Sequence, residues 1–172
     1  CPSPEPDLLL VDRLLARAKK QGMKTALIVG KCDLDGGKLL AQMQEEYRGA
    51  DCPVLGVSAR NKEGLDSVRA LMRGADCCCL AGQSGVGKST LINAILPGVN
   101  LRTADISEAH NTGMHTTTFS EMLPLPGGGY LIDTPGIKGF GLIDIDDAEL
   151  WHYFPEMMRA APDCRFYNCT HT

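Results

Sequence analysis

The amino-acid sequence predicts an α/β fold in which helices flank a mostly parallel β-sheet. Apolar, often β-branched runs predict five strands, near residues 24–29, 53–57, 77–81, 117–125 and 130–133. Segments with helical spacing of apolar residues alternate with the first three strands, which is typical of strand–helix–strand units with parallel strands. The sequence Pro126-Gly127-Gly128-Gly129 joins the last two strands and predicts the single antiparallel hairpin.

Four helices are expected from the spacing of apolar residues. The first begins after Asp7, a suitable capping residue, and stops at Gly22. The next two cover residues 38–47 and 65–73, and the fourth begins near residue 88. Their apolar stripes are expected to pack against the sheet, because such stripes form core far more often than they bind a cofactor.

Length, composition and charge limit the classes of function. With 172 residues, 44% of them hydrophobic, the chain can bury one core of ordinary domain size. The formal net charge is −4, and Lys and Arg form no continuous run in the sequence. This chain alone is therefore not expected to bind RNA phosphates. No apolar stretch reaches the length of a membrane span, and there is no charged-then-apolar leader. We expect a cytoplasmic monomer without membrane contact.

The cysteines are expected to be free thiols. Cys77, Cys78 and Cys79 are consecutive on a predicted strand, so they should point to alternating faces and act as small apolar residues. A disulfide scaffold is the alternative, but it is uncommon in a chain of this size and type.

The strongest chemical signal is the phosphate-binding pattern G-x-x-x-x-G-K-[ST], between the third strand and the fourth helix. Its residues are Gly82, Gln83, Ser84, Gly85, Val86, Gly87, Lys88, Ser89 and Thr90. Glycines let successive N–H groups point inward, and the helix N-terminus adds the positive end of its dipole. Lys88 is expected to assist catalysis by contacting the β- and γ-phosphates, and the Ser89 hydroxyl to bind Mg²⁺. We therefore expect binding of a nucleoside triphosphate rather than a glycine-rich turn without such a role.

A second pattern indicates which base is bound. Gly30-Lys31-Cys32-Asp33 follows the first strand and is close to the [NT]-K-x-D element by which GTPases recognise guanine. The Asp33 carboxylate can accept hydrogen bonds from guanine N1–H and the 2-amino group, and the Lys31 side chain is expected along the base plane. Ser58-Ala59-Arg60 follows the second strand, where GTPases carry an S-A-[KR] element that backs the base. These residues favour GTP, although a K-x-D tripeptide alone is also common in ordinary charged loops.

One residue departs from the guanine pattern. Gly30 occupies the position of the usual Asn or Thr, and this removes a side-chain hydrogen bond near the base. The loss is expected to weaken nucleotide binding by about 0.5–1.5 kcal/mol.

Two further segments are expected to contact Mg²⁺ and the γ-phosphate. Asp133-Thr134-Pro135-Gly136 is a D-x-x-G element at the end of a strand, in which Asp133 would hold the Mg²⁺ hydration shell and the Gly136 N–H would sense the γ-phosphate. Residues 113–118 follow a polar stretch without apolar periodicity, so they predict a switch loop whose Thr117 completes the Mg²⁺ shell.

The order of these elements is circularly permuted, because the base-recognising pair precedes the phosphate loop. The permutation, the motifs G-Q-S-G-V-G-K-S-T, G-M-H-T-T-T and D-T-P-G-I, and the endings Tyr153-Phe154-Pro155-Glu156 and Cys164-Arg165-Phe166-Tyr167-Asn168-Cys169-Thr170-His171 resemble the bacterial ribosome small subunit-dependent GTPase A family. The likeness runs from Asp7 to His171. It implies a GTPase that acts with GTP and Mg²⁺ in late maturation of the small (30S) ribosomal subunit, with that subunit and its rRNA as partners.

The resemblance also implies a domain organisation. Family members carry an N-terminal OB-fold, a central permuted GTPase domain and a C-terminal zinc-binding module. On this basis residues 1–145 are a GTPase domain that lacks its N-terminal strand and OB-fold, and residues 146–172 begin a truncated helical, zinc-binding module. The absent strand is expected in the sheet between the phosphate-loop strand and the base-recognising strand.

Three residues at the end of the chain have a zinc-ligand pattern. Cys164, Cys169 and His171 form C-x4-C-x-H, and the resemblance implies a fourth cysteine further on. Since three ligands rarely hold a structural zinc, we expect Zn²⁺ in the longer parent protein rather than in this chain alone. Buried cysteines and an exposed histidine without metal are the alternative.

The sequence identifies the group that orients the attacking water less clearly than it identifies the other site residues. Ile137 follows the D-x-x-G element, where many GTPases have a glutamine. His115, beside the switch threonines, can accept a hydrogen bond from water, and the resemblance implies this role although Met114 replaces the usual basic residue before it. A solvated loop histidine is the alternative for His115.

For the whole protein, the alternatives are a nucleotide-gated binding module with negligible hydrolysis and a P-loop ATPase, the latter disfavoured by Asp33.

Overall fold

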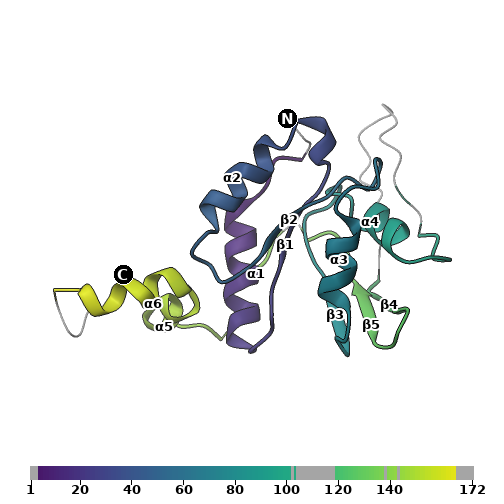
Figure 1. Ribbon diagram of the computed structural model, residues 1–172. Coiled ribbons are helices and arrows are strands. Elements are labelled where there is room, and N and C mark those ends of the chain that lie inside the picture. Colours follow the sequence, from purple (N-terminus) through teal and green to yellow (C-terminus); the bar gives the residue numbers. More distant parts are fainter. Residues whose placement is uncertain (1–3, 102, 104–118, 138, 143, 166–172) are drawn as a thin grey trace.

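The computed structural model describes residues 4–101, 103, 119–137, 139–142 and 144–165 (Figure 1). Its helices are α1 (Leu8–Lys20), α2 (Lys38–Glu46), α3 (Leu65–Met72), α4 (Lys88–Ile95), α5 (Asp147–Leu150) and α6 (Pro155–Ala160). Its strands are β1 (Leu27–Val29), β2 (Val54–Gly56), β3 (Cys77–Leu80), β4 (Glu121–Pro124) and β5 (Tyr130–Asp133). Short 3-10 turns are η1 (Cys32–Leu34), η2 (Trp151–Tyr153) and η3 (Ala161–Asp163). The predicted strands and the first four predicted helices are confirmed, with the strands shorter than expected.

The strands form two separate sheets within the described residues. β1 and β2 pair in parallel, with Ile28 opposite Leu55. The other sheet has the order β3-β5-β4, in which β3 is parallel and β4 antiparallel to β5. The hairpin and the mostly parallel arrangement are therefore confirmed. Among the described residues no ladder joins β1 to β3, and the expected further strand between them stays a prediction.

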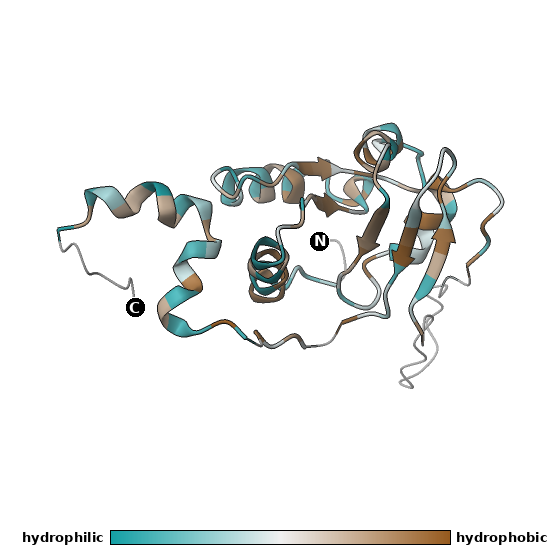
Figure 2. Cartoon of the chain, turned by 90° about the horizontal axis from the view of Figure 1, so that it is seen from below, coloured by the Kyte–Doolittle hydropathy of each residue, from teal (hydrophilic) through white to brown (hydrophobic). Residues whose placement is uncertain are grey.

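Helices cover both faces of the β1–β2 sheet. α3 and α4 pack on one face around Ile92 and Leu65, and this cluster continues under β5 through Leu131. α1 and α2 pack on the opposite face around Val29 and Met43. Because successive strand residues point to opposite faces, β1 contributes to both clusters. The described residues thus form two apolar clusters where the sequence suggested one core, and Figure 2 shows the strands between them in brown.

The cysteines of β3 are only partly what the sequence predicts. The six described cysteines are free thiols, as expected. Cys78 packs against the first cluster, but Cys77 and Cys79 are exposed on the opposite face of the strand. The expectation that all three act as small apolar residues is therefore wrong for Cys77 and Cys79, because among the described residues no helix covers that face of the sheet.

The C-terminal helices lie beside the lower end of α1 (Figure 1), and polar contacts hold them there. None of the residues of α5, η2, α6 and η3 is buried. Arg13 of α1 donates to the Phe140 carbonyl at 3.1 Å, and Lys20 of α1 forms an ion pair with Glu149 at 2.6 Å. Arg159 of α6 pairs with Asp51 at 3.2 Å.

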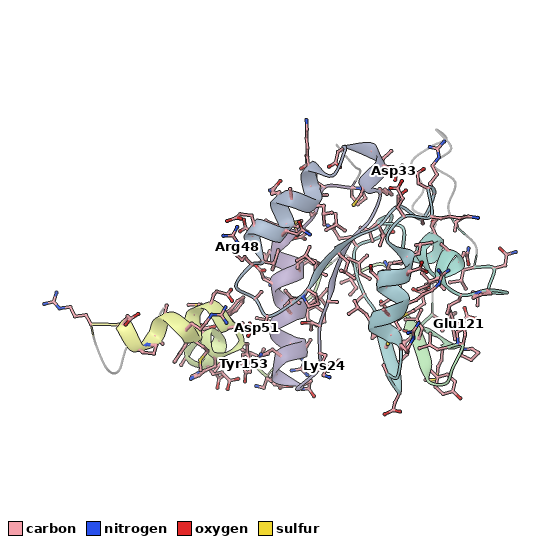
Figure 3. The ribbon with its side chains drawn as sticks, in the orientation of Figure 1. Lys24, Asp33, Arg48, Asp51, Glu121 and Tyr153 are labelled. Carbon is pink, nitrogen blue, oxygen red and sulfur yellow. The ribbon has the colours of Figure 1, made fainter. Side chains whose placement is uncertain are left out.

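A cavity of about 510 Å³ lies between the C-terminal helices and the end of α1. Asp51 and Tyr153, labelled in Figure 3, both line it. The helices are thus attached by charged groups around a cavity and not by a shared apolar core.

The proposed domain boundary at residue 145 remains a prediction. No helix in the described ranges combines the length and apolar character needed to cross a membrane.

We predict that Lys20→Gln loosens the C-terminal helices. The Glu149 carboxylate raises the pKa of Lys20, and the Lys20 ammonium lowers that of Glu149, so both are charged at neutral pH. Amide hydrogen exchange in α5 and α6 should accelerate by about two- to fivefold, the range expected for one exposed ion pair. Arg48→Gln is the control, because Arg48, just after α2, pairs with Glu45 in the last turn of that helix and its loss should leave α5 and α6 unchanged.

Acid should have the same effect as Lys20→Gln. Because the folded-state pKa of Glu149 lies below its ordinary value of 4.5, the ion pair is present above that pH and is lost as the pH falls through the lower value. Equal exchange in the Lys20→Gln and Arg48→Gln proteins would show that this ion pair does not hold the helices.

Candidate nucleotide-binding site

The phosphate loop connects β3 to α4 in the arrangement that the sequence predicts. Gly85 and Gly87 have φ angles of 79° and 98°, in the left-handed region that favours glycine, and Gly87 caps α4. The Lys88 ammonium folds back over the loop and donates to the carbonyls of Gly82 at 2.8 Å and Gln83 at 2.9 Å. The positive charge therefore lies within the loop, where phosphate oxygens would be bound.

The end of β5 places a carboxylate next to this loop. Asp133 is 1% exposed and is paired in register with Leu80, the last residue of β3. Burial lowers the pKa of Lys88, whereas the nearby Asp133 carboxylate raises it. Asp133 and the Ser89 hydroxyl, at the start of α4, are oxygen donors of the kind that Mg²⁺ prefers. These two residues fit a magnesium site, and the third predicted ligand, Thr117, lies outside the described residues.

The D-x-x-G segment is held directly against the phosphate loop. Thr134 donates from its hydroxyl to the Leu80 carbonyl at 2.8 Å, and Ile137 N–H donates to the Gly82 carbonyl at 3.1 Å. A Cβ atom placed on Gly136 would lie 2.6 Å from Ser84 Cα, which is closer than real Cβ atoms approach. Only glycine fits at position 136, and its backbone is thereby available to a phosphate group.

The base-recognising loop is connected to the phosphate loop by Lys31. This residue has a φ of 58° and is the N-cap residue before η1, and its ammonium donates to the Gly85 carbonyl at 3.0 Å. The contact joins two segments that are 54 residues apart in the sequence. The sequence predicts the Lys31 side chain along the base plane but carries no signal for this second contact.

A buried serine orients the predicted guanine-selecting carboxylate. Ser58 is 0% exposed, and its hydroxyl donates to Asp33 Oδ1 at 2.7 Å while accepting from Asn61 N–H at 3.1 Å. A carboxylate accepts several hydrogen bonds, so this one fixes its orientation and leaves it able to receive a base. Asp33 lies near the upper edge of the view in Figure 3, beyond the carboxyl end of β1. Asn61 is a site residue that the sequence did not indicate.

Cys32 occupies the variable position of the first of these elements, and Ala59 the middle position of the second. The Cys32 thiol donates to the Val29 carbonyl at 3.2 Å, and burial raises its pKa, so it is suited to packing rather than to reaction. Ala59 follows Ser58 in the turn that is closed by backbone hydrogen bonds between Ser58 and Glu63.

The structure shows how closely the phosphate loop approaches Gly30. Its φ is outside the left-handed region, so other residues could adopt its backbone conformation. However, a Cβ atom at this position would lie 3.2 Å from the Val86 carbonyl oxygen of the phosphate loop, a tight contact. The glycine therefore allows β1 and the phosphate loop to approach closely, in addition to removing a side-chain hydrogen bond.

Most of the remaining predicted site residues lie outside the part of the chain that the structure describes. His115, Thr117, Cys169 and His171 lie outside the described residues. Cys164, the one described member of the zinc pattern, donates its backbone N–H to the Ala161 carbonyl at 3.1 Å. Within the described ranges no group of three His, Cys, Asp or Glu side chains could hold a metal ion, so zinc stays a prediction.

Comparison with known sequences supports the same arrangement. The sequence model of the RsgA GTPase family matches residues 1–143. Proteins called small ribosomal subunit biogenesis GTPase RsgA, from Bacteroides fragilis and Phocaeicola vulgatus, are 45% and 47% identical over 171 residues. Each alignment covers 98% of this chain and 55% of the relative. The chain thus spans about half the length of the curated relatives it matches.

Comparison with solved structures supports the permuted fold. The crystal structure of YjeQ from Thermotoga maritima matches with a TM-score of 0.74 and 33% identity, over 98% of this chain and 56% of that one. YloQ, described as a circularly permuted GTPase, matches with a TM-score of 0.71 and 27% identity, over 99% of this chain and 53% of that one. The predicted fold class, a circularly permuted P-loop GTPase domain, is confirmed, whereas a zinc module is not shown.

The lack of a side chain at Gly30 has two effects: it avoids a tight contact with the phosphate loop, and it removes a hydrogen bond near the base. We predict that Gly30→Ala and Gly30→Asn distinguish these effects. Both add a Cβ near the Val86 carbonyl, but only Asn adds an amide that can form a hydrogen bond. Ala should weaken GDP binding, and Asn should bind GDP about 2- to 10-fold more tightly than Ala, as one hydrogen bond implies. Gly141→Ala is the control, because a Cβ there meets no atom within 4 Å. Titration with a fluorescent guanine nucleotide measures each affinity, and equal affinities for Ala and Asn would contradict an amide contact.

Proposed function

The chain belongs to the RsgA GTPase family, and on this basis we propose that it binds GTP with Mg²⁺ and hydrolyses it during late maturation of the small ribosomal subunit. The observation that carries the proposal is the meeting of three distant segments at one place. Lys31 of the base-recognising loop contacts Gly85, and Gly136 of the D-x-x-G element lies against Ser84. A phosphate cradle, a γ-phosphate contact and a guanine acceptor are thus adjacent.

Each residue of this site has a proposed role. Lys88 holds the β- and γ-phosphates within the loop, and the Gly136 N–H donates to the γ-phosphate. Ser89, Asp133 and Thr117 hold Mg²⁺, which neutralises charge on the phosphates when bound. Asp33, oriented by Ser58, accepts from the guanine N1–H and 2-amino groups, and this explains a preference for GTP over ATP.

The ribosomal partner is proposed from the relatives, whose name refers to biogenesis of the small ribosomal subunit. The chain has a formal net charge of −4, so its own surface does not favour RNA phosphates. We propose that contact with rRNA comes mainly from parts of the longer protein, including a zinc module that uses Cys164, Cys169 and His171. A cytoplasmic monomer fits this role.

A second candidate is a nucleotide-gated binding module with negligible hydrolysis of its own. It is favoured by Ile137, an apolar side chain at the position from which many GTPases orient the attacking water. The hydrolysis rates with and without small ribosomal subunits separate the two proposals.

We predict that Asp33→Asn changes the preferred base. The amide of Asn would donate where guanine also donates, whereas xanthine has an oxygen at that position. The preference for GTP over xanthosine triphosphate should fall by at least about tenfold, since one charged hydrogen bond is exchanged for a mismatched pair. Competition against a fluorescent guanine nucleotide measures this preference.

The matched control is Asp35→Asn, two residues away. The Asp35 carboxylate accepts from the backbone N–H groups of Gly37 and Leu39 at 3.0 Å each and should not contact the base. Unchanged GTP preference in the Asp33→Asn protein would remove Asp33 from guanine recognition.

We predict that His115→Ala lowers subunit-stimulated hydrolysis. A neutral imidazole can accept a hydrogen bond from the attacking water near pH 7, and Ile137 offers no polar group for this task. In the full-length protein, the stimulated rate should drop by about ten- to a thousandfold with nearly unchanged GTP affinity. His110→Ala, from the polar stretch that precedes residues 113–118, is the control. Stimulated hydrolysis at the parent rate in the His115→Ala protein would exclude His115 from the mechanism.

A further inference from the structure

Ser84 of the phosphate loop lies directly against the D-x-x-G segment. A Cβ atom on Gly136 would lie 2.6 Å from Ser84 Cα, 2.7 Å from its Cβ and 2.9 Å from its N. The Ser84 side chain therefore begins directly beside the backbone of Gly136. It is exposed, so it is not part of either apolar cluster.

Backbone hydrogen bonds on both sides fix this juxtaposition. Thr134 donates its N–H to the Leu80 carbonyl at 3.3 Å and its hydroxyl to the same oxygen at 2.8 Å. Ile137 donates its N–H to the Gly82 carbonyl at 3.1 Å. These bonds continue the register of β3 and β5 beyond the strands, so the position of Ser84 relative to Gly136 follows from the sheet.

The chemistry of the site calls for a polar side chain at this point. In the proposed function the Gly136 N–H donates to the γ-phosphate, so a group that touches Gly136 from the phosphate-loop side also borders the γ-phosphate. Ile137, next in the chain, is apolar. A serine hydroxyl is small and can donate to a phosphate oxygen while its own oxygen accepts from water.

We propose that Ser84 is a catalytic residue whose hydroxyl donates a hydrogen bond to a γ-phosphate oxygen. This role rests on the proposed function and adds a side chain to the backbone contacts expected from the loop. The γ-phosphate oxygens carry the negative charge of the transition state, and a preoriented donor stabilises that charge. Because GDP lacks the γ-phosphate, the same hydroxyl also favours the triphosphate over the diphosphate.

The test compares Ser84→Ala with the unchanged intact protein in the presence of Mg²⁺. Ala keeps the Cβ and removes only the hydroxyl, and the exposed position makes loss of folding unexpected. Single-turnover GTP hydrolysis should be about 10- to 100-fold slower, the range for loss of a hydrogen bond to a charged group. Affinity for a non-hydrolysable GTP analogue should fall by about 3- to 10-fold, while GDP affinity stays within about twofold.

The control is Ser67→Ala, which removes an exposed hydroxyl from α3, outside the site. It should leave the hydrolysis rate and both affinities unchanged. Parent rates and affinities in the Ser84→Ala protein would overturn the role of Ser84, and an equal loss of GDP and GTP-analogue affinity would show that Ser84 shapes the loop instead. Failure of the unchanged protein to bind any guanine nucleotide would instead contradict the proposed function.

Discussion

The parallel pairing of β3 with β5 is the constraint on which the site depends. This register sets Asp133 opposite Leu80, and the hydrogen bonds from Thr134 and Ile137 continue it past the ends of both strands. Leu131 and Asp133 are both buried, as expected for residues two apart on one face of a strand. A slip by one residue would exchange Asp133 for an apolar neighbour and move the carboxylate to the other face. The apolar cluster under Leu131 therefore also fixes the position of Asp133, the proposed Mg²⁺ ligand.

The base-recognising half is built on the other sheet and is joined to the phosphate loop through side chains. Lys31 crosses to the Gly85 carbonyl, while Ser58 fixes the Asp33 carboxylate from within its own half. Since no ladder joins β1 to β3 among the described residues, this crossing and the packing of α3 and α4 hold the two halves in register. The close approach of Val86 to Gly30 belongs to the same junction. The predicted base-recognising loop and the phosphate loop are thus joined by a few specific contacts.

The C-terminal helices are attached by a different kind of interaction. Their contacts with α1 and with the loop after α2 are ion pairs and carbonyl contacts around a cavity, and their residues are not buried. Exposed ion pairs contribute little individually, so this part of the chain is held less firmly than the sheets. The segment that leads to these helices begins directly after Ile137, next to the phosphate loop.

Sequence patterns were enough to predict the secondary-structure elements and a nucleotide as the class of ligand. The strands, the first four helices, the hairpin and the permuted order of motifs were all predicted, because short-range periodicity and motif spacing encode them. The roles of Asp33, Lys88 and Asp133 follow from the same motifs and stay predictions.

The way in which these residues support one another follows from the folded structure alone. Lys31 on Gly85, Asn61 on Ser58 and Ser84 against Gly136 leave no signal in the sequence, and neither does the exposure of Cys77. The physical reason is that each depends on the register of strands and the packing of helices from distant segments. A shift of one strand by one residue along its neighbour would break these contacts without altering any motif in the sequence.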